Sequence, residues 1–308
     1  MGIRRFWYFL KLTRPVFLLG GVVLYLLGAL VAVRDGAVLH PGRLLIGQLL
    51  VTSIQVMTHY ANEYFDLQCD MLNNARTWFS GGSGMLSAGV FSPETARRAA
   101  LLAASVAVIA WLVAGAQVPV VLLLGALSLL AAWYYSAPPL ALVSTGFGEL
   151  TASLVVALMV PLVGCAMQTG GAISTTLLVF CLPLVLIHFA MLLAFEIPDL
   201  PADREAGKRT LTVRMGLDRV TRLHNGLLLL AFLVIGWLYL RGWPGAQLAW
   251  AAAPLALWQI YSIGRYRYWQ PPDQQSNRRF LWLTMGAIGL FAFSAMLLLG
   301  GTLFQIIA

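Results

Sequence analysis

Residues 195–216 read FEIPDLPADREAGKRTLTVRMG, and this stretch decides the fold because an apolar segment ends within it and charged residues follow. Together with the next six residues it carries five acids and six bases, the densest charge in the chain. Asp199 and Asp203 are four residues apart, so both carboxylates point to one side of a helical turn. Lys208 and Arg209 follow in a short loop. Paired acids beside paired bases suit a phosphate group held through a hard cation such as Mg²⁺, and a solvated loop between two apolar helices is the alternative.

The composition of the whole chain is that of a membrane protein. It is 60% hydrophobic and 10% charged, whereas a soluble globular domain carries about 25% charged residues. The mean hydropathy is +0.81. We therefore expect an all-α polytopic membrane protein, with one domain over residues 1–308 and nine transmembrane helices around a central cavity. The nine apolar stretches are centred near residues 17–33, 43–61, 97–115, 118–136, 148–168, 174–197, 224–241, 246–264 and 280–305.

The basic residues predict how the chain is oriented in the bilayer. With nine spans, seventeen Lys and Arg residues fall on the face that holds the N-terminus, and only Arg34, Arg43 and Arg241 fall on the other. The positive-inside rule then places the N-terminus and the loops after the even-numbered spans in the cytoplasm, with the protein in the cell (inner) membrane. The net charge of +8 does not indicate nucleic-acid binding, because the bases are confined to short loops beside the spans.

A second acidic array lies at the end of the second apolar stretch, which reads NEYFDLQCD from residue 62 to residue 70. Asn62, Asp66 and Asp70 occupy positions i, i+4 and i+8 and therefore share one helical face. Acids within a span cost roughly 2.5–3.5 kcal/mol each at the helix centre and less near an interface. Three oxygen-bearing side chains in register therefore favour a bound cation or ligand, with a solvated helix end as the alternative.

The connection after the second span is about 25 residues long, which is too long for an idle turn and is typical of a binding loop. Its residues Gly81, Gly82 and Gly84 could expose backbone N–H groups to a phosphate.

Prolines predict two helix boundaries near the acids. Pro138 should end the fourth span just after Tyr135. Pro198 and Pro201 should break the sixth span and leave Asp199 at a helix N-terminus, where an acid is favoured.

These motifs resemble those of the UbiA superfamily of membrane prenyltransferases. NEYFDLQCD fits an N-x-x-x-D-x-x-x-D motif, DLPAD fits a D-x-x-x-D motif, and the number and order of spans agree over nearly the whole chain. The run DREAGKRTLTVRMG is most similar to the branch that prenylates 1,4-dihydroxy-2-naphthoate in menaquinone biosynthesis. The chain departs from its relatives after YSAPPL, where they often carry bases and it has Ala141, Val143 and Thr145, and in the loop sequence TWFSGGSG.

The resemblance implies a Mg²⁺-dependent enzyme that transfers a polyprenyl group from an allylic diphosphate to an aromatic acceptor within the lipid bilayer. It implies that the catalytic acids Asp66, Asp70, Asp199 and Asp203, together with Asn62, hold the metal and the diphosphate. It implies that the bases Arg14, Arg76, Lys208 and Arg209 neutralise the diphosphate and that Tyr135 faces the prenyl donor or the developing cation. Glu149 and Glu196 are candidates to take the ring proton or to position a hydroxyl of the acceptor.

Other interpretations of the sequence remain. The acceptor could be 4-hydroxybenzoate or another quinone or lipid precursor. A secondary transporter could use the acids to bind ions, but it predicts acids near mid-membrane rather than at helix ends beside a basic loop. A phosphotransferase acting on CDP-alcohols also uses helical aspartates, but its D-x-x-D-G-x-x-A-R signature is absent from the chain. The acceptor, the prenyl chain length and the oligomeric state are left open.

Overall fold

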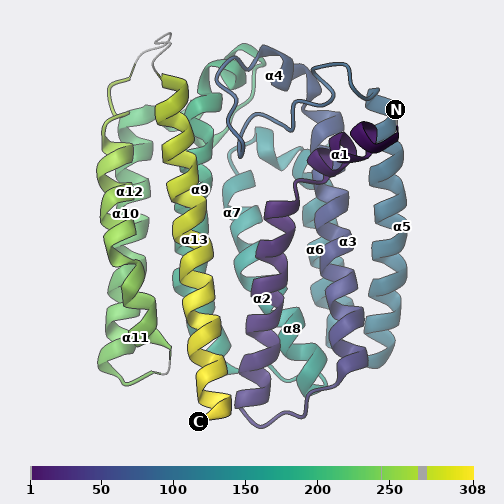
Figure 1. Ribbon diagram of the computed structural model, residues 1–308, viewed down its shortest axis with the longest axis vertical. Helices are drawn as coiled ribbons and strands as arrows, with labels where there is room; N and C mark the ends of the chain where they lie inside the picture. The colour runs from purple at the N-terminus through teal and green to yellow at the C-terminus, as the bar shows by residue number, and fades with distance from the viewer. Residues whose placement is uncertain (1, 244, 270–275) are drawn as a thin grey trace.

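The computed structural model describes residues 2–243, 245–269 and 276–308, and the described chain is a bundle of helices without strands (Figure 1). In chain order the elements are α1 (Gly2–Thr13), α2 (Pro15–Arg34), α3 (Pro41–Phe65), α4 (Leu67–Leu72), α5 (Pro93–Gln117), α6 (Val120–Ser136), η1 (Leu142–Ser144), α7 (Gly148–Leu154), η2 (Val155–Met159), α8 (Val160–Thr169), α9 (Thr175–Glu205), α10 (Leu211–Leu240), α11 (Ala246–Ala249), η3 (Trp250–Ala252), α12 (Ala253–Gly264) and α13 (Ser276–Ile307).

Each of the nine predicted apolar stretches is helical, which confirms the all-α fold class. Seven helices of the described chain are long and apolar enough to cross a membrane, and α6 is a shorter apolar helix of 17 residues. The stretch near 246–264 is broken into α11, η3 and α12. The stretch near 148–168 is continuous but contains a turn of π-helix, η2, just before Pro161, whose missing N–H cannot join the regular ladder.

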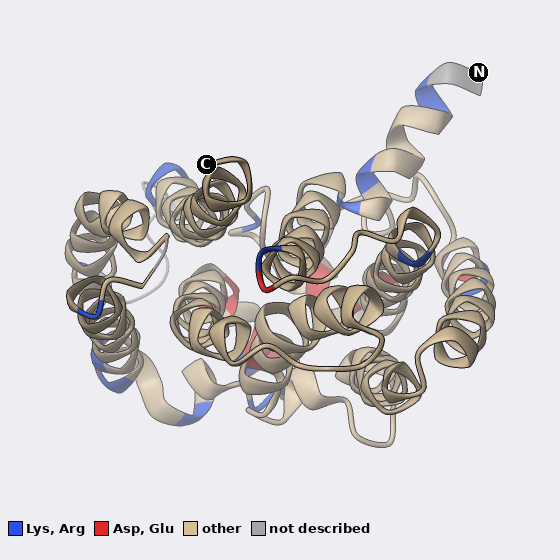
Figure 2. Cartoon of the chain, turned by 90° about the horizontal axis from the view of Figure 1, so that it is seen from below, with Lys and Arg blue, Asp and Glu red and all other residues tan. Residues whose placement is uncertain are grey.

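The two ends of the bundle differ in content. The N-terminus, α1 and α4 lie at one end, which we call the α4 end, and the C-terminus and α11 lie at the other (Figure 1). The two termini lie at opposite ends because the chain runs along the bundle an odd number of times. Seen along the bundle, the helices form a ring with acidic positions near its middle, and α1 projects beyond the rim (Figure 2).

One predicted helix boundary was wrong. Helix α9 runs without a break from Thr175 to Glu205 with Pro198 and Pro201 inside it, so Asp199 lies within a helix and not at an N-terminus. Each proline removes one backbone hydrogen bond, but α9 is packed between neighbouring helices, including α10 and α13, which keep the segment helical. The other boundary was correct, since α6 ends at Ser136, before Pro138.

The helices surround a partly open cavity of about 380 Å³. Side chains from α2, α3, α6, α7, η2, α8, α9 and α13 line it, and most of them are apolar. Tyr135, His59 and His188 are among its polar lining residues. None of the acids of the two arrays belongs to this lining in the described part of the chain.

Candidate active site

The first acidic array lies at the junction of α3 and α4. Helix α3 ends at Phe65 and Asp66 forms its C-cap, yet Asp66 N–H donates to Asn62 and Asp70 N–H donates to Asp66, each at 2.9 Å. The helical spacing therefore continues through the break, and the three side chains stay on one side. Asn62 Nδ2 also donates to Asp66 Oδ2 at 2.5 Å and to Ser136 Oγ at 3.1 Å, which ties the array to α6.

Three side chains, Lys208, Cys69 and Asn73, connect the second array, on α9, to the first. Lys208 Nζ lies 3.2 Å from Asp66 Oδ1 and 3.7 Å from Asp203 Oδ1. Cys69 Sγ donates to Asp203 Oδ1 at 3.2 Å. Asn73 Nδ2 donates to Asp199 Oδ1 at 2.7 Å. The two D-x-x-x-D segments, far apart in sequence, therefore form one site at the α4 end of the bundle.

Burial and charge set the protonation of the groups that lie outside the spans. Burial raises the pKa of the Asp70 carboxyl to about 7, with repulsion from Asp66 and Glu63 adding to the shift while Arg14 opposes it. Burial also raises the pKa of the Cys69 thiol, so it stays protonated and can donate its hydrogen bond. Burial alone would lower the pKa of Lys208, but Asp66 and Asp203 outweigh it and raise that pKa, so Lys208 stays charged.

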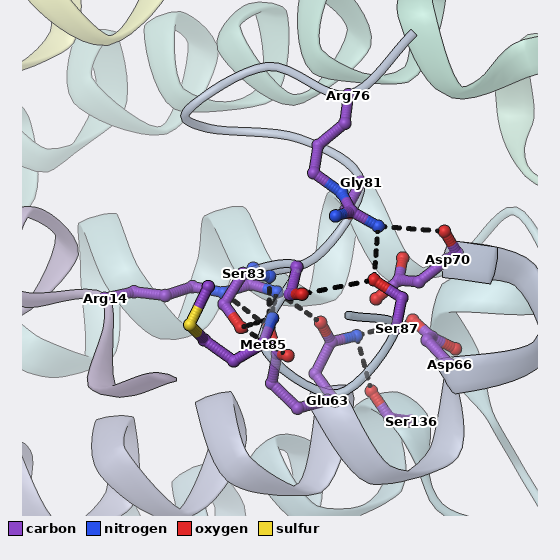
Figure 3. A network of polar contacts seen from close by, with 12 residues as sticks. Arg14, Glu63, Asp66, Asp70, Arg76, Gly81, Ser83, Met85, Ser87 and Ser136 are labelled. Atoms are coloured by element: carbon purple, nitrogen blue, oxygen red, sulfur yellow. Dashed lines mark hydrogen bonds and ion pairs between the residues drawn. The ribbon is translucent and has the colours of Figure 1, made fainter. Parts of the chain in front are cut away.

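Arg14 reaches the site through a buried acid that the motif analysis missed. Glu63, only 2% exposed, pairs with Arg14 Nη2 at 2.5 Å and accepts from Arg14 Nε at 3.2 Å. The same carboxylate accepts from the N–H and the hydroxyl of Ser83 at 2.6 and 2.7 Å (Figure 3). Residues 73–92, between α4 and α5, form what we call the glycine-rich loop. Glu63 therefore holds this loop and Arg14 against α3, and the Ser83 N–H is not free for a phosphate.

Arg76 fastens the other side of the same loop. Its Nε donates to the Gly81 carbonyl at 2.6 Å, and its Nη2 donates to the Asp70 carbonyl at 3.0 Å and to Ser87 Oγ at 2.8 Å (Figure 3). The guanidinium therefore holds the loop over α4 and puts a positive charge beside the first array. Its predicted role toward the diphosphate stays a prediction.

The remaining predicted residues lie around this centre. Arg209 has an exposed side chain, and its backbone N–H donates to the Ser144 carbonyl at 2.9 Å, which joins the 206–210 loop to η1. Tyr135 lines the cavity one residue before Ser136, the partner of Asn62. The site thus lies on the α4 side of the cavity, and Tyr135 lies where the two meet.

Glu149, which is buried, and Glu196, which is partly buried, both accept hydrogen bonds from the start of α10. Leu211 N–H donates to Glu149 Oε1 at 2.9 Å, and Thr212 N–H donates to Glu196 Oε2 at 3.0 Å. The other oxygen of Glu149, Oε2, is buried and has no hydrogen-bond partner among the described residues. The pair therefore joins α7, α9 and α10, and its predicted role toward the acceptor stays a prediction.

The donor set fits Mg²⁺ bound together with a phosphate-bearing ligand. No group of three or more His, Cys, Asp or Glu side chains in the described residues is close enough to hold a metal ion alone. Each array instead offers carboxylates that face the other array, and Mg²⁺ is usually bound through one or two carboxylates plus substrate phosphate oxygens. The partly buried Asp70 carboxyl, whose pKa is raised to about 7, would be ionised by such a cation.

Comparison with known proteins gives the family. The model of the UbiA prenyltransferase family matches residues 21–285, which include both acidic arrays and most of the bundle. The chain belongs to the UbiA prenyltransferase family. This UbiA protein is therefore a membrane-embedded prenyltransferase, as its motifs predicted.

Two relatives carry the same enzyme name. The 1,4-dihydroxy-2-naphthoate octaprenyltransferase of Mycobacterium tuberculosis (strain ATCC 25618 / H37Rv) is 27% identical over 227 residues, which cover 69% of this chain and 71% of the relative. The enzyme of that name from Bacillus subtilis (strain 168) is 27% identical over 209 residues, 67% of this chain and 65% of the relative.

Solved structures of other proteins share the fold. A structure of digeranylgeranylglyceryl phosphate synthase aligns with a TM-score of 0.64 at 14% identity, over 98% of this chain and all of that one. A UbiA homologue from Archaeoglobus fulgidus, bound to GPP and Mg²⁺, aligns with a TM-score of 0.62 at 15% identity, over 94% and 99% of the two chains.

A substitution in the glycine-rich loop should disturb the first array. Gly82 has φ +73°, and a Cβ placed on it would lie 2.0 Å from Asp70 Oδ2. Gly82→Ala is therefore expected to displace the Asp70 carboxylate and to raise the Mg²⁺ concentration for half-maximal activity roughly tenfold or more. Gly89→Ala is the matched control, because Gly89 has φ +68° but open space around its Cβ position. Equal Mg²⁺ dependence in the two variants would contradict a role for Asp70 in binding the cation.

The Glu149–Glu196 pair gives a prediction about stability. Glu149→Gln should leave thermal unfolding in detergent nearly unchanged, because the amide oxygen still accepts from Leu211 N–H. Glu149→Ala should lower the free energy of unfolding by about 1–3 kcal/mol, since it leaves buried polar groups without partners. Two variants of equal stability would show that the pair does not fasten α10.

Proposed function

We propose that this UbiA protein transfers a polyprenyl group from an allylic diphosphate to 1,4-dihydroxy-2-naphthoate in menaquinone biosynthesis, with Mg²⁺ as cofactor. The observation that supports this most directly is the pairing of two acidic arrays through Lys208, directly above an apolar cavity. Charged groups for a diphosphate thus adjoin an apolar space for a prenyl chain. The names of the Mycobacterium and Bacillus relatives support the choice of acceptor.

The metal and phosphate roles follow the residue types in the site. Mg²⁺ would be held by Asn62, Asp66, Asp70, Asp199 and Asp203, and when bound it supplies positive charge for the leaving diphosphate. Lys208 lies between the arrays and Arg209 is exposed beside them, so both can approach phosphate oxygens. Arg14 and Arg76 add positive charge while they hold the loop in place.

The reaction balances without an external oxidant or reductant. The C1–O bond of the allylic diphosphate breaks and the diphosphate leaves with the electron pair, which creates an allylic cation. An electron-rich carbon of the acceptor ring attacks C1, and the proton on that ring carbon is then lost to a base. We assign Glu149 or Glu196 as the carboxylate that accepts this proton or positions a hydroxyl of the acceptor. We assign Tyr135 as the residue that faces the prenyl donor or the developing cation. The apolar cavity excludes water from the cation.

The orientation belongs to the same proposal. The α4 end carries the site and nearly all of the basic residues, and the positive-inside rule therefore places this end in the cytoplasm. A water-soluble diphosphate headgroup and an aromatic acid would both reach the site from that side, while the prenyl chain remains in the bilayer.

The test is product analysis with purified protein in lipid nanodiscs. Allylic diphosphates of several chain lengths would be combined with Mg²⁺ and either 1,4-dihydroxy-2-naphthoate or 4-hydroxybenzoate, and products would be identified by mass spectrometry. We expect a prenylated naphthoate-derived product that disappears when EDTA is added. Product from 4-hydroxybenzoate alone would overturn the acceptor, and no transfer to any acceptor would overturn the proposed reaction.

A further inference from the structure

Three phenylalanine side chains from separate parts of the chain pack together near the site. Phe17 comes from α2, Phe79 from the glycine-rich loop and Phe195 from α9. The ring centroids are 6.2 Å apart for Phe17 and Phe79, 6.3 Å for Phe17 and Phe195, and 6.2 Å for Phe79 and Phe195. The Phe79 and Phe195 rings are nearly parallel, with an interplanar angle of 17°. The Phe17 ring is nearly perpendicular to both, with interplanar angles of 81° and 84°. We call this group the phenylalanine triad.

The triad lies between the acids and the cavity. Phe195 precedes Asp199 by one turn of α9, and Phe17 follows Arg14 by three residues, so both lie slightly deeper in the bundle than the charged site. Phe17 itself lines the cavity, and its ring centroid is 5.8 Å from that of His59, another lining residue. A chain that runs from the acids into the cavity therefore passes the triad.

Phe79 is held in place by its own small network. Thr77 Oγ1 accepts from the N–H groups of Phe79 and Ser80 at 3.2 and 3.1 Å, and Thr77 N–H donates to the Ser80 carbonyl at 3.2 Å. Thr284 on α13 donates to Thr77 Oγ1 at 3.4 Å. These bonds form a tight turn that is anchored to α13 and directs an apolar ring inward. Phe195 is buried, but Phe79 keeps accessible surface for a ligand.

We propose that Phe79 is a further catalytic residue, whose ring contacts the allylic carbons of the prenyl donor as the C1–O bond breaks. This inference rests on the proposed function. The face of an aromatic ring carries partial negative charge, so it attracts a cation, and it does so most strongly where water is excluded. Phe79 packs on Phe17, which lines the cavity, and the apolar ring at this position would also keep water away from the cation.

Phe79→Leu tests the ring while it keeps an apolar side chain of related size. With nanodisc protein, Mg²⁺ and 1,4-dihydroxy-2-naphthoate, we expect kcat to fall roughly 30-fold. We expect KM for the allylic diphosphate to stay near the wild-type value, because the diphosphate contacts remain. We also expect more of the donor to end as free polyprenol, since water can then capture the cation. Phe79→Trp should restore most of kcat and suppress polyprenol.

Phe91→Leu is the matched control. Phe91 is a buried aromatic residue at the end of the same long loop, but its ring packs on Phe9 at 5.9 Å in a separate apolar cluster. We expect this variant to lose some thermal stability without a change in the polyprenol fraction. A polyprenol fraction that rises equally in both leucine variants would show a general loss of packing and would overturn the proposal.

Different results would overturn the role of Phe79 and the proposed prenyl transfer. If the wild-type protein transfers prenyl groups but Phe79→Leu has the same kcat and polyprenol fraction, the role of Phe79 is overturned and the proposed function stands. If Phe79→Leu is slow but Phe79→Trp is equally slow, the ring face is not what matters and the proposal also falls. If the wild-type protein transfers no prenyl group to any acceptor, the proposed function itself is overturned.

Discussion

Replacing Asp199 by asparagine should lower prenyl transfer roughly 100-fold or more, with no loss of stability. Asp199 is partly buried and accepts a hydrogen bond from Asn73 Nδ2 at 2.7 Å, but no basic side chain in the described residues forms an ion pair with it. The asparagine oxygen can still accept from Asn73. The variant therefore removes a partly desolvated charge without removing a contact, which leaves the fold as stable or more stable.

Asp66→Asn should lose activity and stability together. Asp66 Oδ1 lies 3.2 Å from Lys208 Nζ, and both side chains are largely buried, at 11% and 13% exposure. Removing one partner of a buried ion pair typically costs about 3–5 kcal/mol, and the lower end applies here because Asp203 still lies 3.7 Å from Lys208. A difference in stability between the two variants would show that the Asp199 charge is available to a cation, whereas the Asp66 charge is paired with Lys208 within the fold.

The comparison is made on both variants side by side, with transfer rates in nanodiscs and thermal unfolding in one detergent. If Asp199→Asn kept more than about a tenth of wild-type activity, Asp199 would not bind the metal–diphosphate complex. If Asp199→Asn lost as much stability as Asp66→Asn, the Asp199 carboxylate would contribute to the stability of the fold as Asp66 does, and its charge would not be kept for a cation alone.

The sequence was sufficient to predict the helices and the two acidic arrays, for a physical reason. A bilayer requires about 20 apolar residues per crossing, so composition alone reveals the spans. Spacing of four residues places Asp66 with Asp70 and Asp199 with Asp203 on common faces, wherever the helices then pack. The broken eighth stretch, 246–264, was not predicted, because its length and hydropathy are those of a continuous helix.

The contacts that join the arrays could not be predicted from spacing. Cys69 and Asn73 lie within or just after the first motif, but their partners on α9 are more than 120 residues away and depend on how the helices pack. Glu63 did leave a signal, because an acid next to Asn62 in an apolar span is costly unless it is paired. The prolines of α9 misled the helix prediction because tertiary packing overrides a local breaker.

Replacing Glu63 by glutamine should lower the free energy of unfolding by about 3–5 kcal/mol, which is the second large effect that the structure predicts. Glu63 is buried and is the ion-pair partner of Arg14, which is itself only 18% exposed. Arg14 also has a left-handed backbone, with φ 50° and ψ 62°, which is unfavourable for a residue other than glycine. Without Glu63 the charge of Arg14 is buried and unpaired, and nothing of equal strength holds its backbone conformation.

The same substitution should loosen the glycine-rich loop. Glutamine removes the negative charge that Arg14 and the Ser83 N–H share at Glu63 Oε1, and it places an amide nitrogen opposite Ser83 Oγ. The bonds of Arg76 remain on the other side of the loop, so we expect partial release and not unfolding of the loop. Limited trypsin cleavage after Arg76 should become faster, and KM for the allylic diphosphate should rise.

A double-mutant cycle measures whether Glu63 stabilises the fold through its ion pair with Arg14. If Glu63 acts mainly by neutralising Arg14, then Arg14→Met combined with Glu63→Gln should destabilise much less than the sum of the single variants, because neither charge is then left unpaired. Glu94→Gln is the surface control, since Glu94 is an exposed acid that pairs with Arg97 and Arg98 on α5. It should leave stability and trypsin cleavage unchanged. Strict additivity in the cycle would mean that Arg14 and Glu63 stabilise the fold independently, and the loop would then be fastened to α3 through Ser83 alone.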